Sequence, residues 1–476
     1  MSRNPNNLVD SLNFWREYPE RDVEFVRWYP CRLAGLSPRE IFKNKEGSFY
    51  VHIPFCNNVC ISCPYNKFNT KTDVVERYLS ALKKEIDLYV SEPYVQGMEF
   101  TSGYFGGGTP TSLTAKQWED LLAHMQEKLT IHRDASITVE TTPVDITTEK
   151  LKVLTKYGVN RISVGVQSMS NKMLANIGRN YDAGVAMDAL KMINEAGFSH
   201  VCVDLMWGLP GQTMEDWLES IRVLADSGLV EVFSIYQYMV IPSSPLYFKI
   251  QSGMIPKCPD DAEQEKLYWA AVQKFHDYGY KSLTSVDFVQ TAHYEIGDTG
   301  ECIELYSSGE REDDSIIAAT ASIAKHITQS WYFGGDMMAL GAGAFGYLNH
   351  HMYLNEPDLE EYEKKIEEGH MTAVMGTYVS LEERMAKMMV MGLRFLRVYR
   401  KDFIDLYGVD MMMVFGDKIK TLVERELVTI NDEYIQVTYP KGWYYMENIS
   451  KTFYTDNNRG LPQPSSTSTN LLQLLK

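Results

Sequence analysis

Three cysteines within one short stretch are the side chains with the clearest chemical potential in this sequence. They are Cys56, Cys60 and Cys63, spaced CxxxCxxC. Three thiolates on one loop can converge on a soft metal centre. A tetrahedral zinc site would need a fourth ligand, for which His52, Tyr65 and Asn66 are poorly placed. An iron–sulfur cubane usually takes four cysteines, so three would leave one iron open to bind and reduce a substrate.

Composition and charge limit where in the cell this protein can act and what it can bind. The chain has 476 residues, a formal net charge of −17 and a pI of about 5.1. Such an acidic chain would be repelled by nucleic acid and by anionic membranes. It has no apolar run of about 18 residues and no apolar core near its start, so we expect neither a membrane span nor a signal peptide. We expect a cytoplasmic protein, where clustered cysteines indicate a metal site rather than disulfides.

The elements that must position the cysteines alternate between strand-like and helical patterns. Strands are predicted at Phe100–Phe105, Ile137–Glu140, Arg161–Gln167, Val201–Met206 and Val232–Tyr238, and helices at Lys150–Lys156, Ala183–Ala196 and Met214–Asp226. This rhythm predicts an α/β protein of parallel βα units in a full or partial (β/α) barrel. Functional residues should then lie at the C-terminal ends of the strands.

Changes of pattern divide the chain into four predicted parts. They are an N-terminal arm (1–48), a core barrel (49–290), a C-terminal domain (291–455) and a flexible Ser/Thr/Pro-rich tail (456–476). Within the third part, helical stretches precede short strands near Leu427–Ile430 and Tyr434–Thr438. Helices closed by a small β-hairpin favour a winged-helix-like module.

The segment around the cysteines resembles a known signature. Tyr50-Val-His-Ile-Pro-Phe-Cys56 with CxxxCxxC is similar to the radical S-adenosylmethionine (SAM) superfamily, in the branch around the oxygen-independent coproporphyrinogen III oxidases. The resemblance runs from about Tyr50 to Lys451 and includes Tyr104-Phe-Gly-Gly-Gly-Thr-Pro-Thr111. It implies a partial TIM-like barrel and a [4Fe-4S] cluster on the three cysteines. The open iron would chelate SAM, and an electron from a donor such as flavodoxin or ferredoxin would yield a 5′-deoxyadenosyl radical. A zinc knuckle is the alternative.

In that branch two SAM molecules bind side by side, and the resemblance divides the contacts between them. The cluster-bound SAM is assigned Tyr50, Gly107 and Glu140, and the second SAM is assigned Gly108, Thr109, Gln167, Arg179, Asp204 and Met239. Glycines let the backbone approach the zwitterionic end of SAM without a Cβ in the way. Each residue alone also has an ordinary interpretation: a strand-end carboxylate can be a cap, an arginine a surface ion pair, and a triple glycine a tight turn.

Several positions depart from the coproporphyrinogen oxidase pattern. Tyr65 stands where those enzymes carry a fourth cysteine, and Arg27-Trp-Tyr-Pro30 is only a faint echo of their arm motif. The related haem chaperones have a histidine where this chain has Phe345, and they start almost at the cysteine loop. These departures favour the sibling methyltransferases, which use one SAM as the radical source and the second as the methyl donor.

Three functions therefore remain open for a small-molecule substrate. The first is radical C-methylation of a conjugated or aromatic acceptor, or of a tetrapyrrole. The second is oxygen-independent oxidation of coproporphyrinogen III. The third is haem binding as a chaperone, with little turnover of SAM.

Overall fold

One curved sheet organises the part of the chain that the computed structural model describes, which comprises residues 46–58, 60, 61, 63, 67–242, 244–290 and 325–458. The predicted tail from residue 459, nearly all of the predicted arm, and residue 65 lie outside these ranges. In the described chain the sheet has twelve strands in the order β14-β13-β12-β11-β1-β4-β5-β6-β7-β8-β10-β9. The two end strands are not paired with each other, so the barrel is partial.

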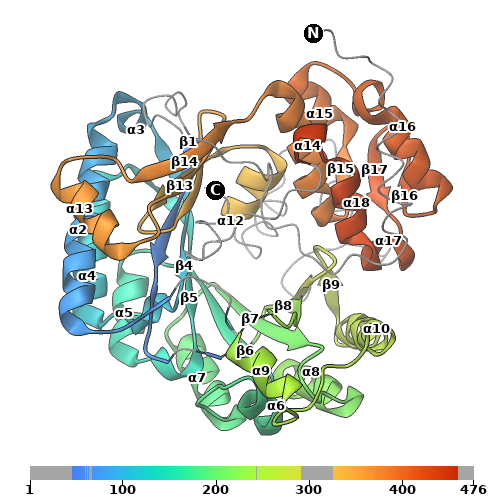
Figure 1. Ribbon diagram of the computed structural model, residues 1–476, viewed down its shortest axis with the longest axis horizontal. Helices are drawn as coiled ribbons and strands as arrows, with labels where there is room; N and C mark the ends of the chain where they lie inside the picture. The colour runs from blue at the N-terminus through green and yellow to red at the C-terminus, as the bar shows by residue number, and fades with distance from the viewer. Residues whose placement is uncertain are drawn as a thin grey trace.

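The central strands run parallel and alternate with helices that pack along the outside of the curve (Figure 1). The strands are β1 (Glu46–Ile53), β4 (Glu99–Gly107), β5 (Ile131–Thr141), β6 (Arg161–Gln167), β7 (His200–Trp207) and β8 (Val232–Gln237). The helices are α2 (Thr72–Ser91), α3 (Pro93–Gln96), α4 (Ala115–Lys128), α5 (Thr148–Lys156), α6 (Asn171–Asn176), α7 (Ala183–Glu195), α8 (Met214–Asp226), α9 (Pro245–Gln251) and α10 (Asp261–Asp277). The predicted partial barrel is therefore confirmed.

Local sequence explains why these elements begin where they do. Thr114 caps α4 in a capping box with Gln117, as its Thr-x-x-Gln pattern predicts. Each parallel strand sends every second side chain outward, where Phe49 and Phe105 meet at 5.7 Å between ring centroids. Phe105 in turn packs against Trp118 of α4, which is fully buried. Apolar burial on this outer face leaves the inner face available for polar side chains.

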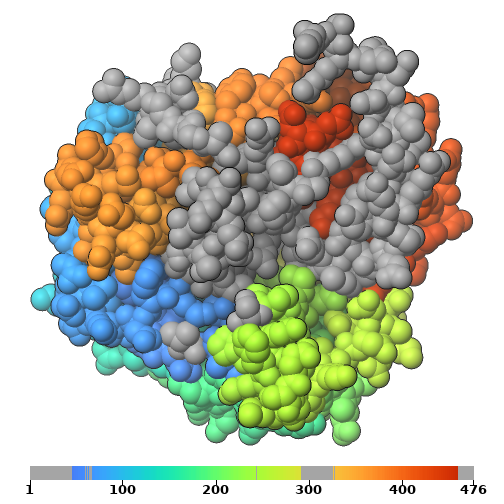
Figure 2. Space-filling view, in the orientation of Figure 1, coloured from blue at the N-terminus to red at the C-terminus, as the bar shows by residue number. Residues whose placement is uncertain are grey.

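Further strands widen the sheet at both edges. They are β9 (Tyr280–Ser282), β10 (Asp287–Gln290), β11 (Asp336–Leu340), β12 (Phe345–Leu348), β13 (His351–Asn355) and β14 (Ala373–Tyr378). β11 pairs parallel with β1, and β12 to β14 continue antiparallel. Helix α13 (Leu359–Glu367) lies against α2, as the orange and blue surfaces of Figure 2 show. Strands β11 to β14, which fall within 291–455, thus belong to the core sheet, and the four-part division stays a prediction.

The C-terminal elements form a helical layer around a small sheet. They are α12 (Lys325–Ile327), η6 (Thr328–Tyr332), α14 (Leu381–Gly392), η7 (Leu393–Phe395), β15 (Arg397–Tyr399), α15 (Arg400–Tyr407), α16 (Met411–Glu424), β16 (Val428–Ile430), β17 (Tyr434–Val437), α17 (Lys441–Tyr444), α18 (Met446–Thr452) and η8 (Asp456–Asn458). The hairpin β16–β17 after α16 confirms the winged-helix-like pattern. Tyr444 contacts Trp269 and Tyr268 of α10, which joins this layer to the barrel.

Candidate functional site

The cysteine loop leaves the barrel directly after β1. Short strands β2 (Phe55–Cys56) and β3 (Phe68–Asn69) pair at its base. Cys56 is buried, at 7% exposed, whereas Cys60 and Cys63 are half-buried. A turn brings the amide of Cys63 to the carbonyl of Cys60 at 3.4 Å, and Lys67 Nζ donates to the carbonyl of Cys63 at 2.6 Å. The fold therefore presents the three thiols from one loop.

The electrostatics of Cys56 reflect this clustering. Burial raises the pKa of its thiol to about 11, and the charges of Cys63 and Cys60 add to the rise, while a hydrogen bond from Thr109 opposes it. Among the described residues, no three Cys, His, Asp or Glu side chains are placed closely enough to hold a metal. Three soft thiolates nevertheless form the donor set that an iron–sulfur cluster takes, so the residues fit one.

The glycine turn after β4 lies against the base of this loop. A Cβ on Gly107, whose φ is +116°, would stand 2.7 Å from the His52 ring, and one on Gly108 would stand 2.7 Å from the Phe55 carbonyl oxygen. The amides of Gly108 and Thr109 donate to the carbonyls of Ile53 and Phe55 at 2.9 and 2.8 Å. The glycines are therefore required by contacts within the chain, a reason that the sequence did not show.

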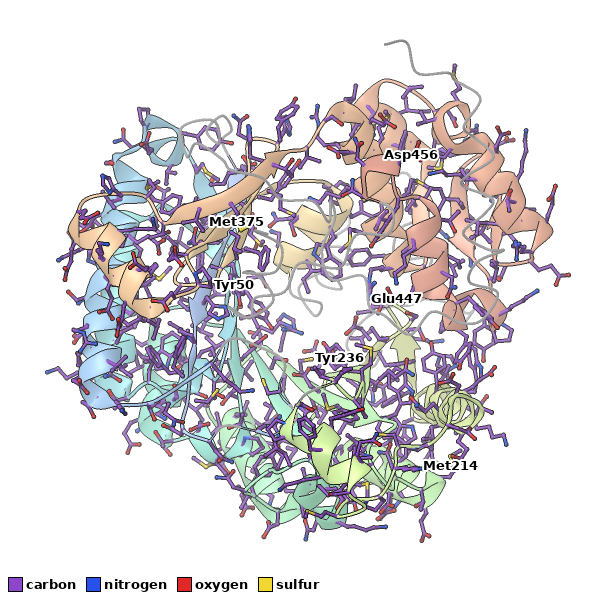
Figure 3. All side chains as sticks on the ribbon, viewed as in Figure 1. Tyr50, Met214, Tyr236, Met375, Glu447 and Asp456 are labelled. Atoms are coloured by element: carbon purple, nitrogen blue, oxygen red, sulfur yellow. The ribbon has the colours of Figure 1, made fainter. Side chains whose placement is uncertain are left out.

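Aromatic and acidic side chains line the inner face of the barrel. Tyr50 stacks on Tyr104 at 6.1 Å between ring centroids, and Tyr104 donates from its hydroxyl to Glu140 Oε1 at 2.5 Å. Gly107 donates its amide to Glu140 Oε2 at 3.3 Å. Figure 3 places Tyr50 and Tyr236 on the inner side of the curved sheet. Tyr50, Gly107 and Glu140, predicted to serve one SAM, thus share one end of the sheet.

Two carboxylates of this inner face have raised pKa values. Burial raises the pKa of Glu140, against the hydrogen bonds from Tyr104 and Gly107. Burial, with the charge of Glu140, raises the pKa of Asp204 to about 7. Ser163 on β6 donates to both oxygens of Asp204 at 3.3 Å. The two carboxylates thus lie on β5 and β7, with β6 between their strands, and the charge of Glu140 acts on Asp204.

Gln167 and Arg179 lie at the C-terminal end of β6 and beyond it. Gln167 has a φ of +67°, in the left-handed region, where the strand turns away. Burial lowers the pKa of Arg179, but the charges of Tyr181 and the three cysteines raise it by more, so the pKa of Arg179 is raised overall. Within the described chain, Gln167 Oε1 and Arg179 Nε are buried without a hydrogen-bond partner. Gln167 Oε1 can therefore accept a hydrogen bond from a polar ligand, and Arg179 Nε can donate one.

Thr109 and Met239, also predicted to contact the second SAM, have neighbours other than the two carboxylates. Thr109 donates its hydroxyl to Cys56 Sγ at 3.5 Å, so it joins the cysteines rather than the carboxylates. Met239 is half-buried just beyond β8, next to Tyr238, whose amide bonds the carbonyl of Trp207 on β7 at 2.7 Å. Met239 thus lies just beyond the C-terminal end of β8, and its contact with SAM stays a prediction.

Two buried acidic residues, Asp145 and Glu85, hold segments next to the site and were not predicted from the sequence. Asp145 bonds Asn57 in the cysteine loop, and Glu85 of α2 accepts the amide of Gly341 at 2.6 Å. Glu85 follows Leu82 and precedes Ile86 in an apolar helical stripe, and a carboxylate in such a stripe was a usable signal. No comparable signal links Asp145 to Asn57.

The fold and the site define a partial α/β barrel with a three-cysteine loop at the C-terminal ends of its strands. The radical SAM superfamily profile matches residues 50–224, and the HemN C-terminal domain profile matches residues 379–445. The chain is 30% identical over 398 residues to the heme chaperone HemW of Bacillus subtilis, spanning 82% of this chain and 95% of that protein.

Three further comparisons point the same way. The oxygen-independent coproporphyrinogen III oxidase of Escherichia coli K12 is 25% identical over 85% of its length and 86% of this chain. The solved structure of coproporphyrinogen III oxidase (HemN) from Escherichia coli has the same fold, with a TM-score of 0.71, 22% identity and coverage of 92% of this chain and 99% of that chain. Anaerobilin synthase of Escherichia coli O157:H7 is 28% identical over 67% of this chain and 65% of its own length.

The chain therefore belongs to the radical SAM superfamily and is a radical SAM enzyme of its HemN-like, coproporphyrinogen oxidase-like branch. That family implies a [4Fe-4S] cluster and SAM as cofactors and a small-molecule substrate. In the described residues no helix is long and apolar enough to cross a membrane.

Proposed function

We propose that this enzyme binds its cluster through Cys56, Cys60 and Cys63 and transfers a methyl group from a second SAM to a carbon of a conjugated or tetrapyrrole acceptor. A bound cluster and SAM would supply the 5′-deoxyadenosyl radical. The observation that carries the proposal is the pair of half-buried carboxylates, Glu140 and Asp204, on two strands of the inner face. The charge of the buried Arg161 opposes the rise in the pKa of both carboxylates, and so favours the ionised form that accepts hydrogen bonds from a ribose diol.

The residues around the carboxylates suit two zwitterionic nucleoside ligands. Tyr50, Gly107 and Glu140 would hold the first SAM next to the cysteine loop. Gln167 and Arg179 have buried polar atoms without partners in the described chain, which suits the second. A guanidinium binds a carboxylate by two parallel hydrogen bonds, so Arg179 would orient its amino-acid end. Asp204 would hold its ribose, Gly108 and Met239 would contact it through the backbone, and Thr109 would lie between the ligand and Cys56.

The names of the relatives support a tetrapyrrole acceptor. The proteins that this chain resembles are named for heme, coproporphyrinogen III and anaerobilin. Tyr50 and Tyr104 give the inner face a stacked aromatic surface, and flat conjugated ligands pack favourably on such rings. A low-potential donor of the flavodoxin or ferredoxin kind would provide the electron.

Two other functions are supported by particular observations. Haem binding as a chaperone is favoured by the likeness to HemW over 95% of that protein. Against it, Phe345, which replaces the chaperone-type histidine, is 4% exposed and packs with Leu354 and Met375. Coproporphyrinogen oxidation is favoured by the shared HemN fold.

Products formed anaerobically with dithionite and methyl-deuterated SAM separate the three functions. Methyl transfer predicts S-adenosylhomocysteine together with deuterium in 5′-deoxyadenosine. Coproporphyrinogen oxidation predicts carbon dioxide and no deuterium in 5′-deoxyadenosine, and a chaperone predicts tight haem binding with negligible turnover. In Asp204→Ala, methyl transfer should fall while uncoupled 5′-deoxyadenosine formation survives. Absence of deuterium from 5′-deoxyadenosine would show that methyl transfer is the wrong reaction.

A further inference from the structure

Hydrogen bonds tie both ends of the cysteine loop to a neighbouring strand end. Asn57 directly follows Cys56, and its Nδ2 donates to Oδ1 of Asp145 at 2.6 Å. Thr70, on the far side of the loop, donates its hydroxyl to Oδ1 of Asn57 at 2.8 Å. The side chain of Asn57 therefore joins the start of the loop, its end, and the segment η3 (Pro143–Asp145) that follows β5.

Asp145 is itself rigidly held. It is 6% exposed, and its Oδ2 accepts the hydroxyl of Thr142 at 2.6 Å. Its backbone carbonyl accepts Lys150 Nζ at 2.9 Å, and the same ammonium bonds the carbonyl of Thr111 at 2.6 Å. The carboxylate thus has a fixed position relative to β5, to α5 and to the turn after the glycines.

The loop needs such a support because its own pairing is short. β2 and β3 pair over two positions only, Phe55 with Phe68 and Cys56 with Asn69. Asn57 is exposed, so a neutral hydrogen bond there would compete with water, whereas a bond to a carboxylate is about twice as strong. Asp145 lies in η3, directly after the end of β5 that carries Glu140. The Asn57–Asp145 bond therefore connects the cysteine loop to the strand that carries the proposed SAM-binding carboxylate.

We propose that Asp145 is a positioning residue that, through Asn57, holds the Cys56 thiol at a fixed position relative to Glu140. This inference rests on the proposed role of Cys56 as a cluster ligand. Residues that orient metal ligands typically change metal affinity by about 10- to 100-fold when they are replaced. The Asn57–Asp145 contact should therefore control how firmly the cluster is held, independently of turnover.

The test measures iron loss to a ferrous chelator from anaerobically reconstituted protein. Asn57→Asp sets a second carboxylate against Asp145 and should release iron about tenfold faster than wild type. Combining Asn57→Asp with Asp145→Asn restores one carboxylate and one amide, and should return the rate to that of wild type. A wild-type rate in Asn57→Asp, or a combined variant that stays as labile as Asn57→Asp, would overturn the inference.

Two controls separate positioning from general instability and from the ligand assignment. Asn160 bonds Ile137 and Ala135 in the middle of β5 at 3.0 and 2.9 Å, so Asn160→Ala should lower Tm without faster iron loss. Cys56→Ala should bind no intact cluster. If Cys56→Ala retains one, the proposed ligand set is wrong. If only Asn57→Asp behaves as wild type, the positioning role alone is wrong.

Discussion

The hydroxyl of Thr109 donates a hydrogen bond to Sγ of Cys56 at 3.5 Å, which joins the glycine turn after β4 to the first thiol of the cysteine loop. The bond favours the thiolate, since it lowers the pKa of Cys56 against the effect of burial. Thr109 thereby affects the proposed metal ligand directly, in addition to any contact with SAM. Hydrogen bonds to cluster sulfurs are among the factors that set reduction potentials.

Replacing Thr109 with Val should therefore make the cluster harder to reduce. A net hydrogen bond of about 1 kcal/mol corresponds to roughly 40 mV for one electron, so Thr109→Val should lower the midpoint potential by about that amount. Anaerobic redox titration followed by electron paramagnetic resonance measures the shift. Thr109→Ser keeps the hydroxyl and should stay near wild type. An unchanged potential in Thr109→Val would show that the bond does not persist in the loaded protein.

Each cysteine of the loop should be required for cluster binding. Cys56→Ala, Cys60→Ala and Cys63→Ala should each abolish the intact cluster and the cleavage of SAM, because two thiolates cannot hold a cubane with one open iron. Iron and sulfide analysis after anaerobic reconstitution checks this. Cys258→Ala is the matched control, since Cys258 is also half-buried but packs beside an apolar cluster around Leu246. Full SAM cleavage in Cys60→Ala would contradict the assignment.

Binding of the second SAM should depend on pH through Asp204. Its pKa is raised to about 7 by burial and by Glu140, so the carboxyl is neutral below that pH and ionised above it. A carboxylate accepts hydrogen bonds from a ribose diol more strongly than a carboxylic acid, so affinity should increase as the pH rises from 6 to about 8. Calorimetric titrations across this range measure the effect.

Asp204→Asn provides the control for this pH profile. The variant has no titrating carboxyl at this position, so the rise in affinity between pH 6 and 8 should disappear. Loss of the charged hydrogen bond should also weaken binding at pH 8 by about 10- to 100-fold. An unaltered pH profile in Asp204→Asn would assign the titration to another group.

Stability should fall with rising pH because of Glu85. Burial raises the pKa of Glu85 to about 7, despite hydrogen bonds from Thr372, Gly341 and Tyr362. Between about pH 4.5 and 7 the folded state keeps this proton while the unfolded state loses it, so the free energy of unfolding decreases across that window. The loss is of order 3 kcal/mol at most.

Thermal unfolding of Glu85→Gln tests this linkage. The variant cannot ionise at this position, so its Tm should change less between pH 5 and 7.5 than that of wild type. Its absolute stability should also fall, since an amide cannot accept at both of the oxygens that Glu85 uses. Parallel Tm profiles of the two proteins would show that Glu85 does not titrate in this range.

Local patterns were enough to predict much of the barrel. Arg161–Gln167 forms β6 and Met214–Asp226 forms α8, at the bounds that periodicity predicted. The capping box at Thr114 is present as its spacing indicates. These features depend on neighbours within a few residues, so their signals are contained in short windows of sequence. The order of βα units likewise predicted which ends of the strands carry the site.

The sequence by itself thus determined the class of fold, the cysteine loop and the family, because each depends on local spacing and residue type. Only the tertiary structure decided which distant residues meet. Asn57 bonds Asp145 across 88 positions, and Glu85 bonds Gly341 across 256. Pairing of β1 with β11 likewise joins segments that are far apart in the sequence, Gly47 with Asp336 among them, and no local pattern predicts it. The role of Thr109 beside Cys56 follows from the same cause, since a glycine turn and a cysteine loop are brought together only when β1 and β4 pair.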